Sequence, residues 1–175
     1  VALAEVAGHA ILRMSNADVL PFDFTNLYKT ANDYATELMH TTNDMRDATT
    51  VENQLLKQND YKLASDPTKT YIQPKPKDEV PFLDFSPLQN ALESLKKSTD
   101  SLQMTLKKND DTSNEKLYVA LARGEQQLLF TNGLPRRSWY RHSLYAPGFY
   151  TGYGVKSLPG IREAVEQGNW NEAQE

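Results

Sequence analysis

Apolar residues recur with the period of a helix in three long segments, and each segment predicts a helix with one buried face. The first begins at about Asn26, with Thr25 as its expected N-cap, and continues to about Leu55. The second begins at Ser86-Pro87, where Ser86 is the expected N-cap and proline is favoured at the first helical position. The stripe of this second helix consists of Leu88, Leu92, Leu95, Thr99, Leu102 and Leu106.

A third helical pattern follows the second and ends at Asn132-Gly133. Three successive helices of this kind predict an all-α fold, an antiparallel helical bundle. Residues 2–14 are rich in alanine and apolar on nearly every side, which predicts a helix buried by a surface that this chain does not obviously supply. Residues 64–85 contain four prolines among lysines and aspartates and predict an exposed loop.

Residues 133–160 form an unusually long connection between helical segments. They hold five of the eight glycines, three of the nine prolines and six of the seventeen aromatic residues. Loops longer than about 12–15 residues are usually functional or disordered, and disordered segments contain few aromatic residues. We therefore expect a long ordered loop. Its tyrosines and arginines could orient a carboxylate of a ligand, or its aromatic rings could fasten the loop to the bundle.

Charge and composition exclude several functions for the chain alone. The net charge of −4 and the lack of a basic face argue against a nucleic-acid partner. The densest basic cluster, Arg136, Arg137 and Arg141, is too small to track phosphates and is expected to be solvated or salt-bridged. There is no cysteine, and the three histidines form no HExxH motif. We expect His9 to be packed, no metal site in this chain, and no catalytic residue.

Two blocks of sequence resemble a known family. These are VALAEVAGHAILRMSNADVLPFDF, residues 1–24, and GLPRRSWYRHSLYAPGFYTGYGVKSLPGIREAVEQG, residues 133–168. They are similar, in the same order, to the C-terminal part of the glutamate carboxypeptidase II and transferrin receptor family of zinc peptidases. The resemblance is more specific to the fungal members of that group.

The resemblance implies a parent protein with a zinc peptidase domain, an apical domain and a helical dimerisation domain. Residues 1–22 would be the tail of the peptidase domain, and residues 23–175 the helical dimerisation domain without its last helix. The implied partners are a second copy, through the helical domain, and the protein's own peptidase domain, which would hold the zinc. The implied location is the lumenal, extracellular or vacuolar side of a single-pass membrane protein.

The resemblance also implies roles for three residues of the loop. Tyr153 matches a tyrosine that hydrogen-bonds the carboxylate of the C-terminal residue of a small peptide substrate. Gly152 stands where glutamate-preferring members have a lysine, so no cation is present there for a second carboxylate. His142 matches a histidine near the same pocket. The neighbouring aromatic residues are expected to pack instead: Trp139, Phe149 and Tyr150.

Three functions follow from these observations. The first is a helical dimerisation and substrate-capping domain of a zinc-dependent exopeptidase, to which this chain contributes dimer surface and a carboxylate contact but no zinc ligand. The second is a domain of a catalytically inactive receptor or trafficking adaptor of the same architecture. The third is a free-standing helical interaction module, which would self-associate through its exposed apolar faces.

Overall fold

The computed structural model describes residues 2–17, 23–108 and 115–175, and this part of the chain is mostly helical. Its elements, in chain order, are α1 (Ala2–Ser15), α2 (Phe24–Lys57), α3 (Asp60–Leu63), α4 (Ser86–Lys108), α5 (Glu115–Ala122), the 3₁₀ helix η1 (Gly124–Leu128), β1 (Tyr145–Pro147), β2 (Val155–Ser157), α6 (Pro159–Glu166) and α7 (Trp170–Gln174). The predicted helical fold is confirmed. Within the described ranges, no helix is both long and apolar enough to cross a membrane.

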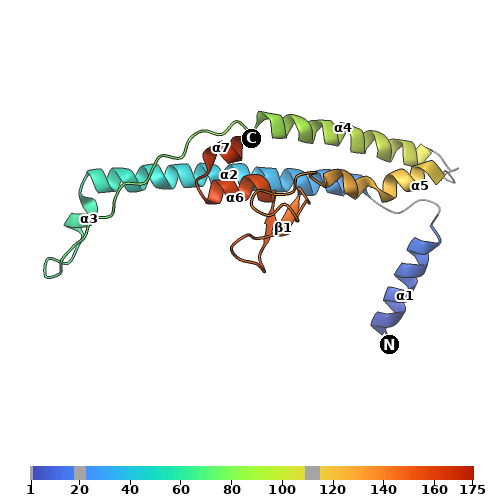
Figure 1. Ribbon diagram of the computed structural model, residues 1–175, viewed down its shortest axis with the longest axis horizontal. Coiled ribbons are helices and arrows are strands. Elements are labelled where there is room, and N and C mark those ends of the chain that lie inside the picture. The colour runs from blue at the N-terminus through green and yellow to red at the C-terminus, as the bar shows by residue number, and fades with distance from the viewer. Residues whose placement is uncertain (1, 18–22, 109–114) are drawn as a thin grey trace.

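The long helix α2 is the axis of the fold. Helix α4 runs back along it in the opposite direction, and α5 reverses direction again beside the start of α2 (Figure 1). The contact between α2 and α4 centres on Ala31, Ala35 and Leu92, all buried. Two alanines on α2 leave room for the leucine stripe of α4 to approach closely. The predicted antiparallel arrangement is therefore present, with its apolar seam where the periodicity placed it.

A second buried cluster holds the C-terminal helices against the middle of α2. Leu38 of α2 packs with Ala164 and Val165 of α6, and Ala173 of α7 completes the cluster. Both α6 and α7 are short, and short helices gain most of their stability from tertiary packing. This cluster therefore decides where α6 lies relative to the long loop before it.

An aspartate lies just before each of the two long helices. Asp23, and not the predicted Thr25, is the N-cap of α2, and the predicted N-cap Ser86 is the first residue of α4. The Oδ1 atom of Asp23 accepts a hydrogen bond of 2.9 Å from the amide of Thr25, and Asp84 Oδ1 accepts one of 2.9 Å from the amide of Ser86. Both hydrogen bonds belong to the same local pattern, aspartate, phenylalanine, then a hydroxyl residue, but α2 begins at the phenylalanine and α4 begins at the hydroxyl residue. The aspartate carboxylate is the stronger acceptor, and it satisfies an amide that would otherwise lack a partner.

The stability that Asp84 contributes should depend on pH. Hydrogen bonds from the side chain and then the backbone of Ser86 hold the pKa of Asp84 below its ordinary value of 3.8. A carboxyl with a lowered folded-state pKa stabilises the fold above its unfolded pKa, and this contribution is lost as pH falls through the folded pKa. We expect Asp84→Ala to lower the melting temperature at neutral pH, and this difference from the wild type should shrink below pH 3.8. Thermal melts at several pH values measure it, and a difference that is constant down to strongly acidic pH would contradict the assignment.

The third predicted helix is interrupted, so its predicted continuation to Asn132-Gly133 is wrong. Helix α5 ends at Ala122, and η1 follows from Gly124. A Cβ atom on Gly124 would lie 3.2 Å from the ring of Phe24, so glycine allows the chain to pass close to the start of α2. Beyond η1 the chain pairs with the loop instead, through a bridge between Leu129 and His142. The spacing of the leucines could not show that pairing with the loop would replace continuation of the helix.

The proline-rich segment, residues 64–85, is exposed over most of its length, as predicted, but side chains of α2 hold it in place along that helix (Figure 1). The Asn53 side chain donates to the carbonyl of Lys77 at 2.8 Å and accepts from its amide at 2.9 Å. Arg46 donates to the carbonyl of Val80 at 3.2 Å. Because side chains of α2 pair with its backbone groups, the proline-rich segment can remain extended without forming a helix or a strand.

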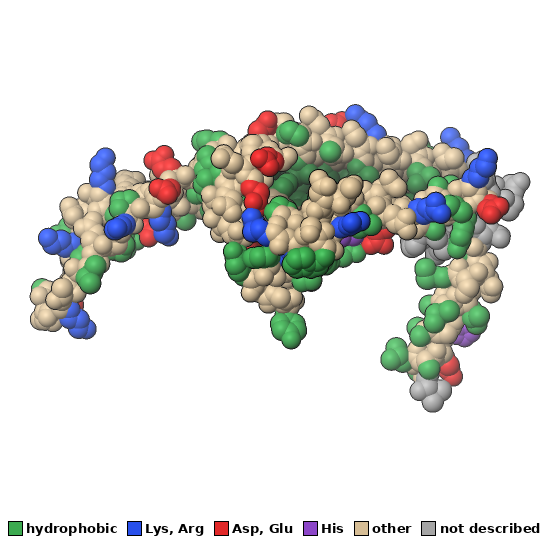
Figure 2. Space-filling model, viewed as in Figure 1, with side chains coloured by type: hydrophobic (Ala, Val, Ile, Leu, Met, Phe, Trp, Pro, Cys, Tyr) green, Lys and Arg blue, Asp and Glu red, His purple; other side chains and the backbone are tan. Residues whose placement is uncertain are grey.

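The N-terminal helix α1 forms as predicted, but none of its residues is buried. Its apolar side chains lie on the surface in Figure 2, and His9, predicted to be packed, is exposed. Residues 18–22, which include the connector at Pro21, lie outside the described residues. The predicted domain boundary between residues 22 and 23 stays a prediction.

Candidate functional site

The long loop opens with a tight turn. Gly133 has a φ of +70°, and a Cβ atom there would lie 2.2 Å from the carbonyl oxygen of Ser138. Only glycine fits this close approach of backbone to backbone. The turn is closed by a hydrogen bond of 2.8 Å from the amide of Leu134 to the carbonyl of Tyr140. The loop is therefore ordered from its first residues.

A small antiparallel hairpin carries the tip of the loop. Strand β1 pairs with β2 so that Tyr145 lies opposite Ser157, and Pro147 lies opposite Val155. The tip, residues 148–154, is closed by a hydrogen bond of 2.7 Å from the amide of Gly148 to the carbonyl of Gly154. The predicted order of the loop is confirmed, and the two strands are an addition to the predicted all-α fold. Strands of three residues are too short for an alternating pattern to reveal them.

A buried ion pair connects this hairpin to α6. Arg137 Nη2 lies 2.7 Å from each carboxylate oxygen of Glu163, and the two side chains are only 6% and 7% exposed. Arg137 also donates through Nη1 to the carbonyl of Pro147 at the end of β1. The amide of Phe149 donates to Glu163 Oε1 at 2.9 Å. One arginine and one glutamate thus join the opening turn, the hairpin and α6.

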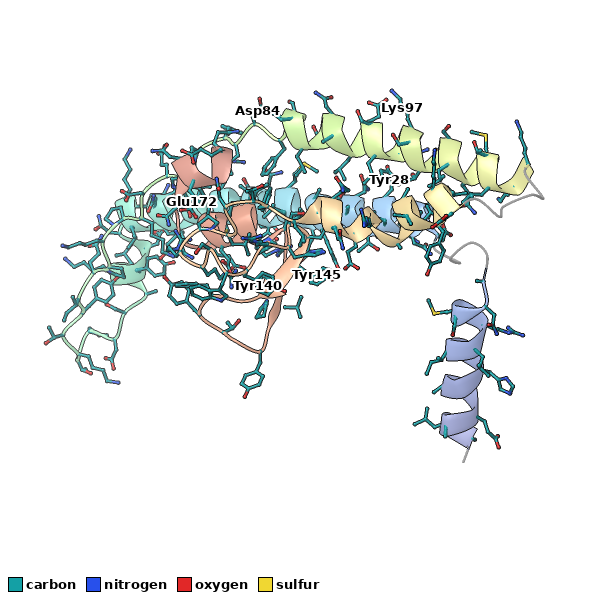
Figure 3. All side chains as sticks on the ribbon, turned by 45° about the vertical axis from the view of Figure 1, so that its right-hand side comes forward. Tyr28, Asp84, Lys97, Tyr140, Tyr145 and Glu172 are labelled. Carbon is teal, nitrogen blue, oxygen red and sulfur yellow. The ribbon has the colours of Figure 1, made fainter. Side chains whose placement is uncertain are left out.

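A second arginine of the cluster is paired further out. Arg136 makes two hydrogen bonds to Glu172 of α7, at 2.7 and 2.9 Å, and these side chains are 35% and 27% exposed. The hydrogen bonds with Glu172 raise the pKa of Arg136 above its ordinary value. Figure 3 shows Glu172 on α7, on the flank of α2. The prediction of a salt-bridged arginine cluster is confirmed for Arg136 and Arg137.

Tyr153 and Gly152 occupy the outermost part of the tip. The Tyr153 side chain is fully exposed, and only its backbone is held, by a hydrogen bond of 2.7 Å to the carbonyl of Thr151. Gly152 has a φ of +64° with open space where a side chain would lie. Hydrophobic side chains gather round the base and at the end of this projection in Figure 2. The loop therefore holds a phenol hydroxyl clear of the bundle, free to hydrogen-bond a group outside this chain.

The predicted packing of the neighbouring aromatic residues is only partly correct. Phe149 lies near the guanidinium groups of Arg136 and Arg137, each 5.8 Å from its ring centroid. Phe149 is still 37% exposed, and Trp139 and Tyr150 are more exposed, although the ring of Tyr150 meets that of Phe149 edge-on at 4.8 Å. Both rings add exposed apolar surface to the loop, and the spacing of the loop could not predict this.

His142 lies in a different place, in the wall of a cavity of about 240 Å³ between the start of α2, the end of α5 and the loop. Its ring stacks on Tyr145 at 4.0 Å, and its Nε2 atom is 3.6 Å from Glu125 Oε1. Tyr145 donates to the same oxygen at 2.9 Å, which raises the pKa of Tyr145. His142 is buried in the wall of this cavity, whereas Tyr153 is fully exposed at the tip of the loop and does not line the cavity.

The exposed phenol of Tyr153 offers a hydrogen bond to a bound group. Within the described ranges, no three histidine, cysteine, aspartate or glutamate side chains converge to hold a metal ion. A rigid tyrosine can donate a hydrogen bond to a carboxylate, and such bonds to a charged group are stronger than those between neutral groups. Sequence reasoning placed Arg137 in a basic cluster but missed Glu163, the carboxylate with which it pairs. Glu163 looks like an ordinary glutamate on a helix, and the sequence carries no signal for its role.

Comparison with known proteins agrees with this architecture. Residues 83–175 match the model of the transferrin receptor-like dimerisation domain. The chain is 29% identical over 173 residues to a probable glutamate carboxypeptidase of Arabidopsis thaliana, covering 95% of this chain and 19% of that protein. It is 26% identical over 183 residues to a probable glutamate carboxypeptidase of Arthroderma benhamiae, covering 100% of this chain and 20% of that protein. The chain thus spans about a fifth of the length of these relatives. Because the matched residues make up more than half of its length, the chain belongs to the family of transferrin receptor-like dimerisation domains.

Proposed function

We propose that this domain both dimerises and caps the substrate site of a glutamate carboxypeptidase-like zinc exopeptidase. The exposure of Tyr153 at the end of a braced loop carries the proposal. A tyrosine that only fastened the loop would lie against the bundle, with its ring buried. An exposed phenol on a fixed stem suits contact with the terminal carboxylate of a small peptide. Gly152 leaves the adjacent position without a cation, so the proposed contact selects for a chain terminus and not for a glutamate side chain.

The zinc would lie outside this chain, in the peptidase domain of the parent protein. A catalytic zinc ion lowers the pKa of bound water and polarises the scissile carbonyl. The residues of this chain would bind and orient the peptide by its carboxylate. Correct orientation raises the rate because the reacting groups no longer have to find one another.

Two further contacts belong to the proposal. Residues 1–22 would be the tail of the peptidase domain. The rest of that domain would cover the exposed apolar side chains of α1. Residues 23–175 would pair with a second copy in a homodimer. Sedimentation of the full-length protein tests the pairing, and a monomer at micromolar concentration would exclude it.

We further propose that the parent lies on the lumenal, extracellular or vacuolar side of a membrane.

Replacing Tyr153 by phenylalanine tests the carboxylate contact in the full-length protein. A hydrogen bond to a charged group contributes about 1.5–3 kcal/mol, so we expect KM for a small peptide to rise at least about tenfold. The value of kcat should change little, because the terminal carboxylate is bound alike in the ground and transition states. Steady-state kinetics with a zinc-loaded preparation measure both constants.

Tyr150→Phe is the matched control, because Tyr150 is also exposed on the same tip. It should leave KM unchanged. Equal kinetics for the two variants would exclude the proposed contact. A wild-type protein that binds no zinc and hydrolyses no peptide would instead place this domain in a receptor or adaptor.

A further inference from the structure

One buried carboxylate joins three parts of the loop that are separate in the sequence. Glu163 projects from α6, both its oxygens accept from Arg137 of the opening turn, and Oε1 also accepts from the amide of Phe149. Through Arg137 the same connection reaches the carbonyl of Pro147. Pro147 and Phe149 flank Gly148, the residue with which the tip begins.

The burial of this pair makes its geometry demanding. A buried charge is tolerated only when it is paired and hydrogen-bonded, since removing it from water costs several kcal/mol. The carboxylate of Glu163 meets this condition only while Arg137 and the amide of Phe149 both stay in place. The outer pair of Arg136 and Glu172 is more exposed and makes no hydrogen bond to the backbone of the tip. Of these two pairs, only the inner one makes hydrogen bonds to the backbone on either side of Gly148.

The tip itself contributes little to its own placement. Its internal hydrogen bonds run from Gly148 to Gly154, from Gly152 to Gly148 and from Tyr153 to Thr151. They close the tip into a small ring but do not attach it to the bundle. The Tyr153 side chain touches none of the bundle, because it is fully exposed. The direction of Tyr153 thus depends on the base of the ring, where Glu163 holds the amide of Phe149.

We infer that Arg137 and Glu163 are positioning residues that aim Tyr153 at the substrate carboxylate. This inference rests on the proposed function, because it assumes that Tyr153 makes that contact. The pair acts through the backbone at Pro147 and Phe149 and touches no substrate. Its burial explains why it holds the tip so firmly, since any displacement of Phe149 removes one of the partners that the buried carboxylate needs.

Hydrogen exchange of the full-length protein tests the bracing without any activity. Glu163→Gln keeps the shape of the side chain and removes its charge. We expect a peptide covering residues 148–154 to exchange at least about tenfold faster in this variant, while peptides from α2 and α4 keep their wild-type rates. Glu172→Gln, at the outer pair, should leave the tip unchanged. Unchanged exchange of the tip in Glu163→Gln would overturn the inference.

A double-mutant cycle then tests the effect on the substrate. We expect Glu163→Gln to raise KM about fivefold or more with kcat within about twofold. The double variant should have the same KM as Tyr153→Phe alone, because the pair acts on the substrate only through that tyrosine. Two effects that simply multiply would show that the pair acts independently of Tyr153 and would overturn the positioning role. Leu56→Ala, at a buried site on the far end of α2, controls for general loss of stability and should leave KM unchanged.

The two proposals fail in different ways. If Tyr153→Phe alone leaves KM unchanged, the proposed substrate contact is wrong, and Arg137 and Glu163 do not position Tyr153 for that contact. Faster exchange in Glu163→Gln would still show that the pair holds the tip in place. If Tyr153→Phe raises KM and Glu163→Gln does not, the contact stands and the positioning role is wrong. Should Glu163→Gln fail to fold, Glu163→Asp is measured in the same way, because it keeps the charge and withdraws the carboxylate by one methylene.

Discussion

Truncation of Glu163 to alanine is expected to lower the free energy of unfolding by about 3–5 kcal/mol, the cost of breaking a buried ion pair by removing one partner. The variant leaves the guanidinium of Arg137 buried with no carboxylate beside it, and the amide of Phe149 loses its acceptor. Both groups would need water that the packed base of the loop does not admit. Urea unfolding followed by circular dichroism measures the loss.

Glu172→Ala provides the matched control for this prediction. It removes the same kind of residue from an arginine–glutamate pair with two hydrogen bonds, but from a pair that is 35% and 27% exposed instead of 6% and 7%. Water can solvate Arg136 after the change, so we expect a loss of only about 0–1 kcal/mol. Similar losses in the two variants would mean that burial is not what distinguishes the inner pair.

Replacement of Leu38 by alanine should destabilise the chain by about 2–5 kcal/mol. Leu38 is fully buried, and its side chain packs with Ala164 and Val165 of α6. Its truncation opens a cavity that neighbouring alanines are too small to fill. The same unfolding experiment measures the effect. Leu63→Ala, at a side chain that is 80% exposed, is the control and should change stability by less than about 0.5 kcal/mol. Comparable losses would contradict the assignment of the core.

These two predictions meet in α6. Its apolar side packs on Leu38 of the bundle, and its Glu163 holds the loop. The position of the tip therefore depends on how α6 packs against α2. The packing of α6 on α2 therefore supports the proposed substrate contact.

The helices were predictable because burial of one face imposes a period that the residue types must follow. The stripe of α4 and the buried face of α2 both follow this period. The end of α5 was not predictable in this way. Its leucines continue at helical spacing, but Gly124 and the pairing of Leu129 with His142 draw the chain into the loop. Local spacing carries no information on a partner further along the chain.

The sequence by itself determined the helical class, the ordered loop, the family blocks, and Tyr153 and Gly152 as the residues to examine in that loop. The tertiary structure alone decided which polar groups meet. Arg137 and Glu163 are 26 residues apart, one on a turn and one on a helix, and nothing in their spacing connects them. Periodicity records which face of a helix avoids water. A buried ion pair depends on the whole path of the chain between its members, and that path is set only when the helices pack.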